Sequence, residues 1–261
     1  FRTIMIDEAA QCPESWMWGL FQPGVERIYM AGDPLQLPAL ASSKGTGLKF
    51  ARSMMERLMD LNYPSELLNV QRRMHPSIVE FANKEFYGSK LKTEYTEFSG
   101  LSESKTIAPI QAINIIGKES MEGTSSLNIL EAHVVKQQVQ ELKQVFDDIA
   151  VLAPYQAQVD KLISLGVENV HTLDSFQGRE ADAVVLSIVR SGKNMGFWKS
   201  KQRLNVGLTR AKHAMRIVGS VKAWLASDTP LSEMMKHMRE KKQIIPVDAK
   251  YIISLKLPMT I

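Results

Sequence analysis

The feature that most constrains the fold is a repeated alternation of short apolar runs with segments of helical periodicity. Residues 149–153, 183–189 and 214–218 are apolar runs typical of parallel strands that are buried on both faces. Residues 127–146 lie before the first of these runs and have the apolar spacing of a long helix. Strands that alternate with helices in this way predict an α/β fold, in which helices cover both faces of a parallel sheet.

The two ends of the chain continue the pattern. Residues 25–31 predict a strand, and residues 48–61 predict a helix that ends before Pro64. Residues 232–242 predict an amphipathic helix near the carboxyl terminus. Three methionines share one side of that helix, and we interpret them as core residues: Met234, Met235 and Met238.

Composition excludes several classes of protein. Apolar residues make up 44% of the 261 residues and charged residues 23%, as in ordinary globular proteins, and no stretch approaches the roughly 18 apolar residues of a membrane-spanning helix. The single cysteine, Cys12, rules out an internal disulfide and favours a reducing, intracellular location, either cytoplasmic or nuclear. The five histidines have no cysteine partners at metal-ligand spacing, so we expect no zinc site. A net charge of +4 is compatible with a nucleic-acid partner but does not require one.

Two polar segments near the amino terminus point to nucleotide chemistry. Asp7 and Glu8 directly follow an apolar strand, and a Gly-Asp-Pro turn after the next strand presents Gln36. Parallel strands deliver such side chains to one edge of a sheet, where ligands of α/β proteins bind. In nucleotide hydrolysis one acid holds Mg²⁺ and a second acid orients or deprotonates the attacking water. An Asp-Glu pair alone is usually a solvated pair, but together the two segments indicate an ATP-driven enzyme.

The loop that would bind the ATP phosphates is missing from this sequence. Residues 44–49 are rich in glycine and lysine but lack the Gly-Lys-Ser/Thr ending of a phosphate-binding loop, and they follow the Asp-Glu strand instead of preceding it. Phe1 leads directly into a predicted strand, with no turn or cap before it. We therefore expect the chain to be the carboxyl-terminal part of a longer protein, with the phosphate loop in the missing amino-terminal part.

Four further segments place polar side chains at the ends of predicted strands or helices. Arg72 and Arg73 lie between a short strand and a helix, where a guanidinium could stabilise charge on a transferred phosphoryl group. A solvated basic turn is an equally good interpretation of that segment alone. Arg210 is expected on a helix that leads into the strand at 214–218. The four segments are residues 71–76, 151–158, 172–182 and 204–212.

Six motifs follow one another in a characteristic order. They are Asp-Glu-Ala-Ala-Gln (7–11), Gly-Asp-Pro-Leu-Gln-Leu-Pro (32–38), Gln-Arg-Arg-Met-His-Pro (71–76), Ala-Pro-Tyr-Gln-Ala-Gln (153–158), Asp-Ser-Phe-Gln-Gly-Arg-Glu-Ala-Asp (174–182) and Asn-Val-Gly-Leu-Thr-Arg-Ala-Lys (205–212). This order resembles superfamily 1 helicases of the up-frameshift type, the group that includes senataxin and the nonsense-mediated-decay helicase. The resemblance implies two RecA-like lobes: the carboxyl-terminal part of the first at residues 1–64, a nearly complete second at 65–226, and a helix and tail at 227–261.

The resemblance also implies roles for the nucleotide-site residues. Asp7 would coordinate Mg²⁺, Glu8 would activate the hydrolytic water, and Gln36 would sense the γ-phosphate of ATP. Arg73 and Arg210 would act as arginine fingers; Arg73 is preferred to Arg72 because it keeps the family's spacing to the Met-His-Pro segment. Contacts to nucleotide are implied for Gln177, Gly178 and Glu180.

The resemblance places five residues toward the nucleic-acid channel: Pro154, Tyr155, Gln158, Thr172 and Ser175. No aromatic-rich segment is evident, which favours contact with the sugar-phosphate backbone over base stacking. Gly207 stands where the family usually has alanine, which leaves Arg210 in register.

The function that these motifs predict is ATP-dependent movement along single-stranded RNA or DNA, with unwinding in the 5′-to-3′ direction by resemblance. The isolated chain is expected to lack ATPase activity because the phosphate loop is missing. One alternative is a non-catalytic scaffold that keeps the helicase fold, although a scaffold would not need Asp7, Glu8, Gln36, Arg73 and Arg210 together. Another alternative is a different nucleotide-using α/β enzyme such as a kinase, in which the Gln-Gly-Arg-Glu and Leu-Thr-Arg-Ala segments have no role.

Overall fold

The computed structural model describes residues 1–39, 43–97 and 107–254. Its internal contacts divide the chain into two compact units, Phe1–Leu68 and Asn69–Ile261, which we call unit 1 and unit 2. Each unit is described by itself.

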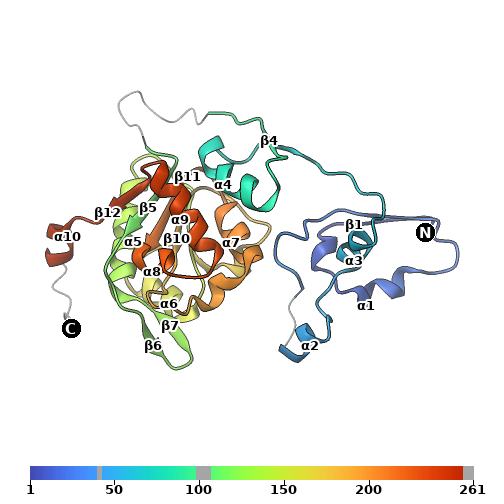
Figure 1. Ribbon diagram of the computed structural model, residues 1–261, viewed down its shortest axis with the longest axis horizontal. Coiled ribbons are helices and arrows are strands. Elements are labelled where there is room, and N and C mark those ends of the chain that lie inside the picture. The colour runs from blue at the N-terminus through green and yellow to red at the C-terminus, as the bar shows by residue number, and fades with distance from the viewer. Residues whose placement is uncertain (40–42, 98–106, 255–261) are drawn as a thin grey trace. The chain divides into compact units, whose positions relative to one another are not determined.

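Unit 2 is built around a six-stranded sheet in which every neighbouring pair of strands is parallel (Figure 1). The central strands β10 and β11 are the longest and are almost completely buried. In spatial order the strands are β12 (Ile244–Pro246), β5 (Ile110–Asn114), β11 (Ala211–Gly219), β10 (Ala181–Ser187), β8 (Ile149–Ala153) and β9 (Val170–Thr172).

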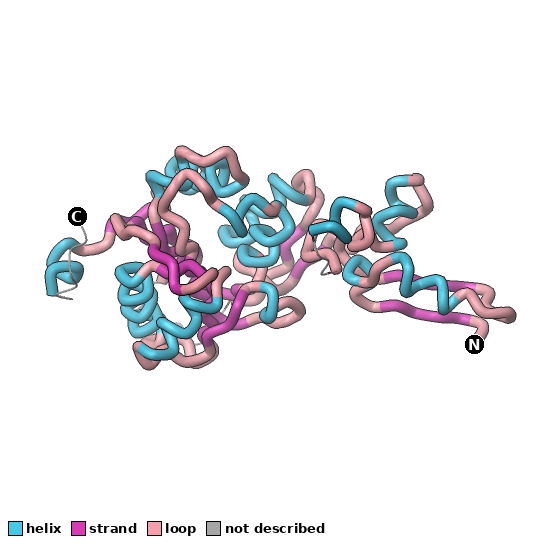
Figure 2. Tube along the Cα trace, turned by 90° about the horizontal axis from the view of Figure 1, so that it is seen from below, coloured by secondary structure: helices cyan, strands magenta, loops and turns pink. Residues whose placement is uncertain are grey.

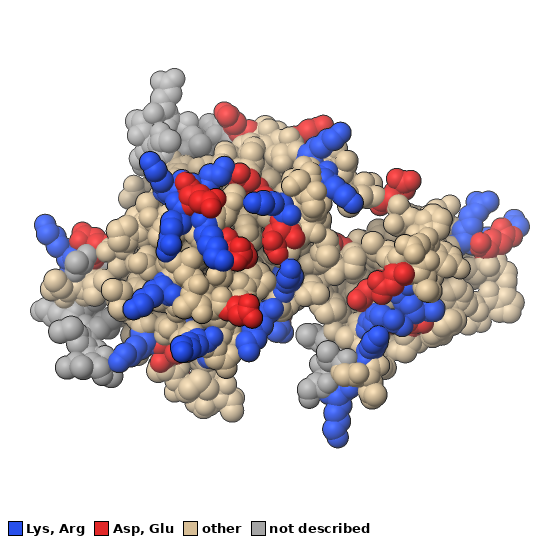
Figure 3. Space-filling view, viewed as in Figure 1, with Lys and Arg blue, Asp and Glu red and all other residues tan. Residues whose placement is uncertain are grey.

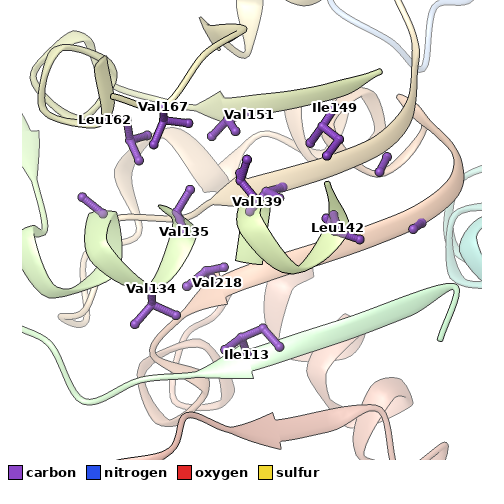
Figure 4. Packing of buried hydrophobic residues seen from close by; sticks show 14 of the residues in the cluster. Ile113, Val134, Val135, Val139, Leu142, Ile149, Val151, Leu162, Val167 and Val218 are labelled. Carbon is purple, nitrogen blue, oxygen red and sulfur yellow. The ribbon is translucent and has the colours of Figure 1, made fainter. Parts of the chain in front are cut away.

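Helices cover both faces of this sheet, which confirms the predicted α/β class (Figure 2). On one face, Val135 and Val139 of α5 (Ile129–Leu142) belong to a buried cluster with Val151 and Val185 of the sheet (Figure 4). The helix α6 (Gln156–Ser164) packs beside α5. The other face carries α4 (Pro76–Phe86), α7 (Lys201–Leu208), α8 (Val221–Leu225) and α9 (Pro230–Glu240).

The helices α8 and α9 contribute buried side chains to the core of unit 2. In α9, Met234, Met235 and Met238 are 1%, 0% and 1% exposed, which confirms the interpretation of the three methionines as core residues. Trp224 of α8 is also fully buried. The remaining described elements of unit 2 are short. The strand β3 (Val70–Gln71) pairs with β4 (Lys92–Thr93), and β6 (Ser120–Glu122) pairs with β7 (Ser125–Leu127). The 3₁₀ helices η3 and η4 span Asp174–Phe176 and Gly196–Lys199, and α10 spans Ala249–Ser254.

Side-chain caps explain several helix boundaries. Asn128 caps the amino end of α5, because its Oδ1 accepts a hydrogen bond from the backbone N of Glu131 at 3.1 Å. Ser200 begins α7 in the same way, accepting from the backbone N of Arg203 at 3.2 Å. In α4, Pro76 occupies the first turn, where its missing N–H costs no hydrogen bond.

Unit 1 contains a two-stranded parallel sheet, β1 (Thr3–Ile6) with β2 (Arg27–Met30). The prediction of a buried strand before Asp7 is wrong for this structure, since Met5 is 81% exposed and Tyr29 of β2 is 55% exposed. A parallel strand is buried only when layers cover both of its faces. Few apolar residues are buried in the described part of unit 1: Ala9, Ala10, Met17, Leu37 and Met54.

The helix predicted at residues 48–61 is also wrong in its first half. The helix α3 spans Met54–Asp60. It begins at Met54 because Ser53 caps it by accepting a hydrogen bond from the backbone N of Glu56 at 3.0 Å. Lys49 before it has a left-handed φ of 59°, which interrupts helical geometry. The other short helices of unit 1 are α1 (Glu14–Met17) and α2 (Ser43–Gly47). Among the described residues of the chain, no helix is both long enough and apolar enough to cross a bilayer.

Candidate nucleotide and nucleic-acid sites

The two acids of unit 1 lie where β1 ends. Glu8 adopts a left-handed conformation with φ 51°, and its backbone N donates to Asp7 Oδ1 at 2.9 Å. Gln11 Nε2 donates to Glu8 Oε2 at 2.8 Å. Both carboxylates are exposed to solvent, so each is available to a cation or a water molecule.

The second motif of unit 1 lies beside the first. Ala9 N donates to Ala31 O at 2.8 Å, and a Cβ on Gly32 would lie only 2.9 Å from the backbone N of Ala10. Glycine is therefore required at this position, where the two turns approach closely. Asp33 Oδ2 accepts from Gln36 Nε2 at 2.9 Å, which fixes the amide of Gln36. Both predicted segments thus meet at the carboxyl ends of β1 and β2.

This donor set suits Mg²⁺ that is bound together with a nucleotide. Within the described parts of the chain, no group of three His, Cys, Asp or Glu side chains is arranged to hold a metal ion. Mg²⁺ commonly uses only one or two carboxylates and completes its shell with water and substrate phosphates. Asp7 and Glu8 fit that pattern.

In unit 2, Arg73 lies next to Glu180, although the two are 107 residues apart in sequence. Arg73 Nε forms an ion pair with Glu180 Oε2, and its Nη1 donates to Thr209 O at 3.1 Å. His75 N donates to Lys212 O at 2.8 Å, which ties the Arg73 segment to the start of β11. Three predicted motifs therefore meet at the amino ends of β10 and β11.

A lysine extends this charged cluster. Lys212 Nζ lies 3.1 Å from Asp182 Oδ1 and 3.8 Å from Glu180 Oε1. The hydrogen bond to Asp182, together with the nearby carboxylates, raises the pKa of Lys212 above its ordinary value. Lys212 is therefore a permanent cation beside Glu180.

Arg210 differs sharply from Arg73. Its prediction on a helix is wrong: α7 ends at Leu208, and Arg210 lies in the turn before β11. Arg210 is 2% exposed, whereas the side chain of Arg73 is 33% exposed. The Arg210 guanidinium donates to Val206 O at 3.0 Å, Arg179 O at 3.2 Å and Thr209 Oγ1 at 3.0 Å. In this arrangement Arg210 supports the turn on which Arg73 and Glu180 meet.

The segment between β9 and β10 carries Gln177 and Gly178. Gly178 has a φ of +76°, a conformation that favours glycine, and no atom lies within 4 Å of a Cβ built on it. The Nε2 atom of Gln177 is buried and has no hydrogen-bond partner among the described residues. A buried donor of this kind is suited to a ligand oxygen.

The predicted nucleic-acid residues lie mostly at the opposite end of the strands. Pro154 and Tyr155 follow β8, while Thr172 ends β9 and bonds through Oγ1 to Ser175 Oγ at 3.0 Å. Gln158 is placed differently, because it is 0% exposed. Its Oε1 accepts from Asn128 N at 2.8 Å and its Nε2 donates to Ser187 Oγ at 3.1 Å, so its amide faces the interior.

Phe197, which the sequence did not single out, and Arg203 connect this surface. The ring centroids of Phe197 and Tyr155 are 6.2 Å apart, and the Arg203 guanidinium lies 4.2 Å from the centroid of Phe197. Arg203 Nη2 also contacts Asp174 Oδ2 at 3.2 Å, which links the ring pair to the Thr172–Ser175 turn. The available signal was the Phe197-Trp198 pair between two motifs, but Phe197 and Tyr155 are distant in sequence and only the fold brings them together.

Comparisons with known proteins show the family of this chain. The AAA domain family matches residues 50–222, and a second AAA domain family matches residues 1–44, so the chain belongs to the AAA domain proteins. Within them it is a superfamily 1 helicase sequence of the up-frameshift and senataxin type.

Three relatives illustrate the similarity. The chain is 33% identical to "Regulator of nonsense transcripts 1" of Dictyostelium discoideum over 94% of its own length and 20% of that protein. It is 34% identical to "ATP-dependent helicase NAM7" of Saccharomyces cerevisiae over 92% of the chain and 27% of the relative. It is 37% identical to "Uncharacterized ATP-dependent helicase MJ0104" of Methanocaldococcus jannaschii over 90% of the chain and 38% of the relative. The chain thus spans well under half the length of these relatives.

Among solved structures, the chain resembles arterivirus nonstructural protein 10 (helicase) in complex with DNA. The TM-score is 0.49 at 15% identity, over 90% of this chain and 42% of that one.

Proposed function

We propose that this chain is part of an ATP-dependent helicase that moves along single-stranded RNA or DNA and separates strands. The observation that carries the proposal is the pairing of Arg73 with Glu180 beside Thr209, because it joins three helicase motifs that are remote in sequence. Relatives named ATP-dependent helicases support the same activity. The 5′-to-3′ direction, an intracellular location and completion by an amino-terminal part are further elements of the proposal, and they rest on the resemblance.

In this proposal unit 1 supplies the hydrolytic groups. Asp7 holds Mg²⁺, Glu8 takes a proton from the attacking water, and Gln36 responds to the γ-phosphate. The exposed carboxylates and the fixed amide of Gln36 support these roles. ATP with Mg²⁺ supplies the phosphoryl group that is transferred to water.

Unit 2 supplies positive charge and nucleotide contacts in the same cycle. Arg73 is the arginine finger, since a third of its side chain is exposed and its Glu180 partner orients it. Glu180, Gln177 and Gly178 contact the nucleotide, and the buried donor on Gln177 supports this role. Arg210 would act on phosphate only by leaving its hydrogen bonds, so its first role is to position the Arg73 turn.

The nucleic acid follows the other end of the sheet in this proposal. Tyr155, Pro154, Thr172 and Ser175 provide its contacts, and the buried Gln158 positions the segment that carries Tyr155. Hydroxyl groups of Thr172 and Ser175 are suited to sugar and phosphate oxygens.

The test is Glu8→Gln in the complete protein. The change removes the base but keeps the side-chain size, so ATP should still bind while single-turnover hydrolysis falls about 10²- to 10⁴-fold. Glu26→Gln is the matched control, because Glu26 is an exposed acid of the same unit that pairs with Arg2. Hydrolysis within a few-fold of the parent in Glu8→Gln would contradict the proposed role of Glu8.

An ATPase assay on the complete protein would also distinguish a helicase from a non-catalytic scaffold. A scaffold would bind nucleic acid but show no hydrolysis in the parent protein. For the chain by itself we expect negligible ATPase activity even with nucleic acid added, because the backbone amides and lysine of a phosphate loop are not in its sequence.

A further inference from the structure

We propose that Arg203, supported by Phe197, forms a stacking site for one base of single-stranded nucleic acid. The inference rests on the proposed function and names two residues and a contact mode for its nucleic-acid surface. Charge alone does not mark this site, because basic and acidic side chains are interspersed over unit 2 on the face drawn in Figure 3. The site is distinguished by the arrangement of its aromatic rings and the guanidinium.

The rings under Arg203 form a firm support. Arg203 lies over Phe197 with 4.2 Å between the guanidinium carbon and the ring centroid. Phe197 contacts Tyr155 on one side and Trp198 on the other, with centroids 6.2 Å and 5.2 Å apart in edge-to-face geometry. Trp198 is fully buried, and its Nε1 donates to Ile188 O at 2.8 Å. A guanidinium over a ring can present its other face as a plane on which a base stacks.

The charge of Arg203 is already partly offset. Its Nη2 contacts Asp174 Oδ2 at 3.2 Å, and about a third of each side chain is exposed (33% for Arg203 and 31% for Asp174). A carboxylate beside the guanidinium weakens its attraction for phosphate, while a third of the Arg203 side chain stays exposed. Arg203 is therefore better suited to a base than to the backbone of the nucleic acid.

The loop that carries Phe197 starts from a constrained turn. Val189, two residues after β10 ends, is fully buried and has a left-handed φ of 69°, which is rare for a β-branched residue. Its backbone N donates to Glu131 Oε1 at 2.8 Å, and Ser187 Oγ donates to the same oxygen at 2.6 Å. Such a strained conformation persists only where surrounding contacts impose it, and strain of this kind clusters at functional sites.

The experiment compares two labelled oligonucleotides of about ten residues, near the length that one binding module covers. One is oligothymidylate, and the other has the same backbone with abasic sites in place of the bases. Affinity for the 261-residue chain is measured by fluorescence anisotropy. Phe197→Leu removes the ring, and Arg203→Lys keeps the charge but removes the planar group.

Both variants should weaken binding of oligothymidylate by about five- to a hundredfold and leave binding of the abasic oligomer unchanged. Arg203→Lys should also keep the salt dependence of binding, since no charge is lost. The matched controls are Phe21→Leu, an exposed phenylalanine of unit 1, and Arg2→Lys, an exposed arginine paired with Glu26. Neither control should change either affinity.

Equal weakening toward both oligomers, or no weakening toward either, overturns the stacking site while nucleic-acid binding itself stands. If the parent chain binds neither oligomer, the nucleic-acid role of unit 2 fails, and the stacking site fails with it. Circular dichroism checks folding. Should Phe197→Leu not fold, Arg203→Lys alone decides, because it leaves the ring packing in place.

Discussion

Units 1 and 2 are built from the same kind of local sequence but differ in how far they bury it. In unit 2, β10 is an apolar strand with parallel neighbours on both sides, and Val184, Val185 and Leu186 are 0% exposed. In unit 1, β1 is a similar apolar strand with one neighbour, and Met5 is 81% exposed. The difference teaches that an apolar run specifies a strand, while its burial depends on how many other elements pack against it.

The candidate site residues of the two units also differ in how far they are enclosed by other residues. The acids of unit 1 are exposed at the end of a strand, whereas the arginines of unit 2 are held by hydrogen bonds to groups far away in sequence. Unit 1 therefore presents its acids on an exposed surface, whereas hydrogen bonds to distant segments fix the positions of the arginines of unit 2.

The largest expected effect concerns what unit 2 contributes to hydrolysis. Arg73→Ala in the complete protein should reduce ATP turnover by about 10³- to 10⁵-fold, the range that arginine fingers contribute, with little change in nucleotide affinity. Arg72→Ala is the control, since Arg72 is exposed and pairs with Glu94 at 2.6 Å. Steady-state ATPase assays check both variants. A larger loss in Arg72→Ala would reverse the assignment of the two arginines.

A core substitution should separate the stabilities of the two units. Leu186→Ala removes a fully buried side chain of β10, so the free energy of unfolding of unit 2 should fall by about 2–5 kcal/mol. Met5→Ala changes an exposed side chain of β1 and should alter stability by no more than about 0.5 kcal/mol. Hydrogen exchange of peptides from each unit measures both values. Similar losses in the two variants would show that β1 is buried in solution.

Burial in unit 2 should also make its stability depend on pH. Glu131 is fully buried, and desolvation raises its pKa to about 8 despite hydrogen bonds from Ser187 and Val189. Because the folded pKa exceeds the unfolded value, folding favours the protonated form, and stability is lost as pH rises from about 5 to 8. We expect a loss of roughly 3 kcal/mol over this range in urea unfolding.

Glu131→Gln should remove most of that pH dependence while keeping an acceptor for Val189. The control is Glu233→Gln, an exposed acid of α9 paired with Lys236. An unchanged pH profile in Glu131→Gln would mean that another group titrates.

The smallest effect should distinguish the two arginines by stability. Arg210→Ala removes the donor to the Arg179 carbonyl and one of the donors to the Val206 carbonyl, which should cost about 1–3 kcal/mol in the free energy of unfolding of unit 2. Arg73→Ala removes a partly exposed side chain and should cost less than about 1 kcal/mol. Urea unfolding of the chain measures both. Equal costs would mean that Arg73 supports the fold as much as Arg210 does.

The local sequence pattern was sufficient to predict several strands and helices of unit 2. The strand predicted at 149–153 is β8 to the residue, and the helix at 127–146 contains α5. The order of six motifs was enough to identify the helicase family. These features depend on side-chain periodicity and on short motifs, and both are properties of neighbouring residues. The roles assigned to the motif residues stay predictions.

Other features were decided by tertiary structure alone. The burial of Arg210 and Gln158, the exposure of β1 and the contact between Tyr155 and Phe197 all depend on which distant segments pack together. Periodicity states which face of an element is apolar, but it does not state what covers that face or which polar groups are left to bond. The sequence by itself determined the family and most of the main strands and helices of unit 2; packing between remote segments decided which of the polar side chains are enclosed and which face solvent.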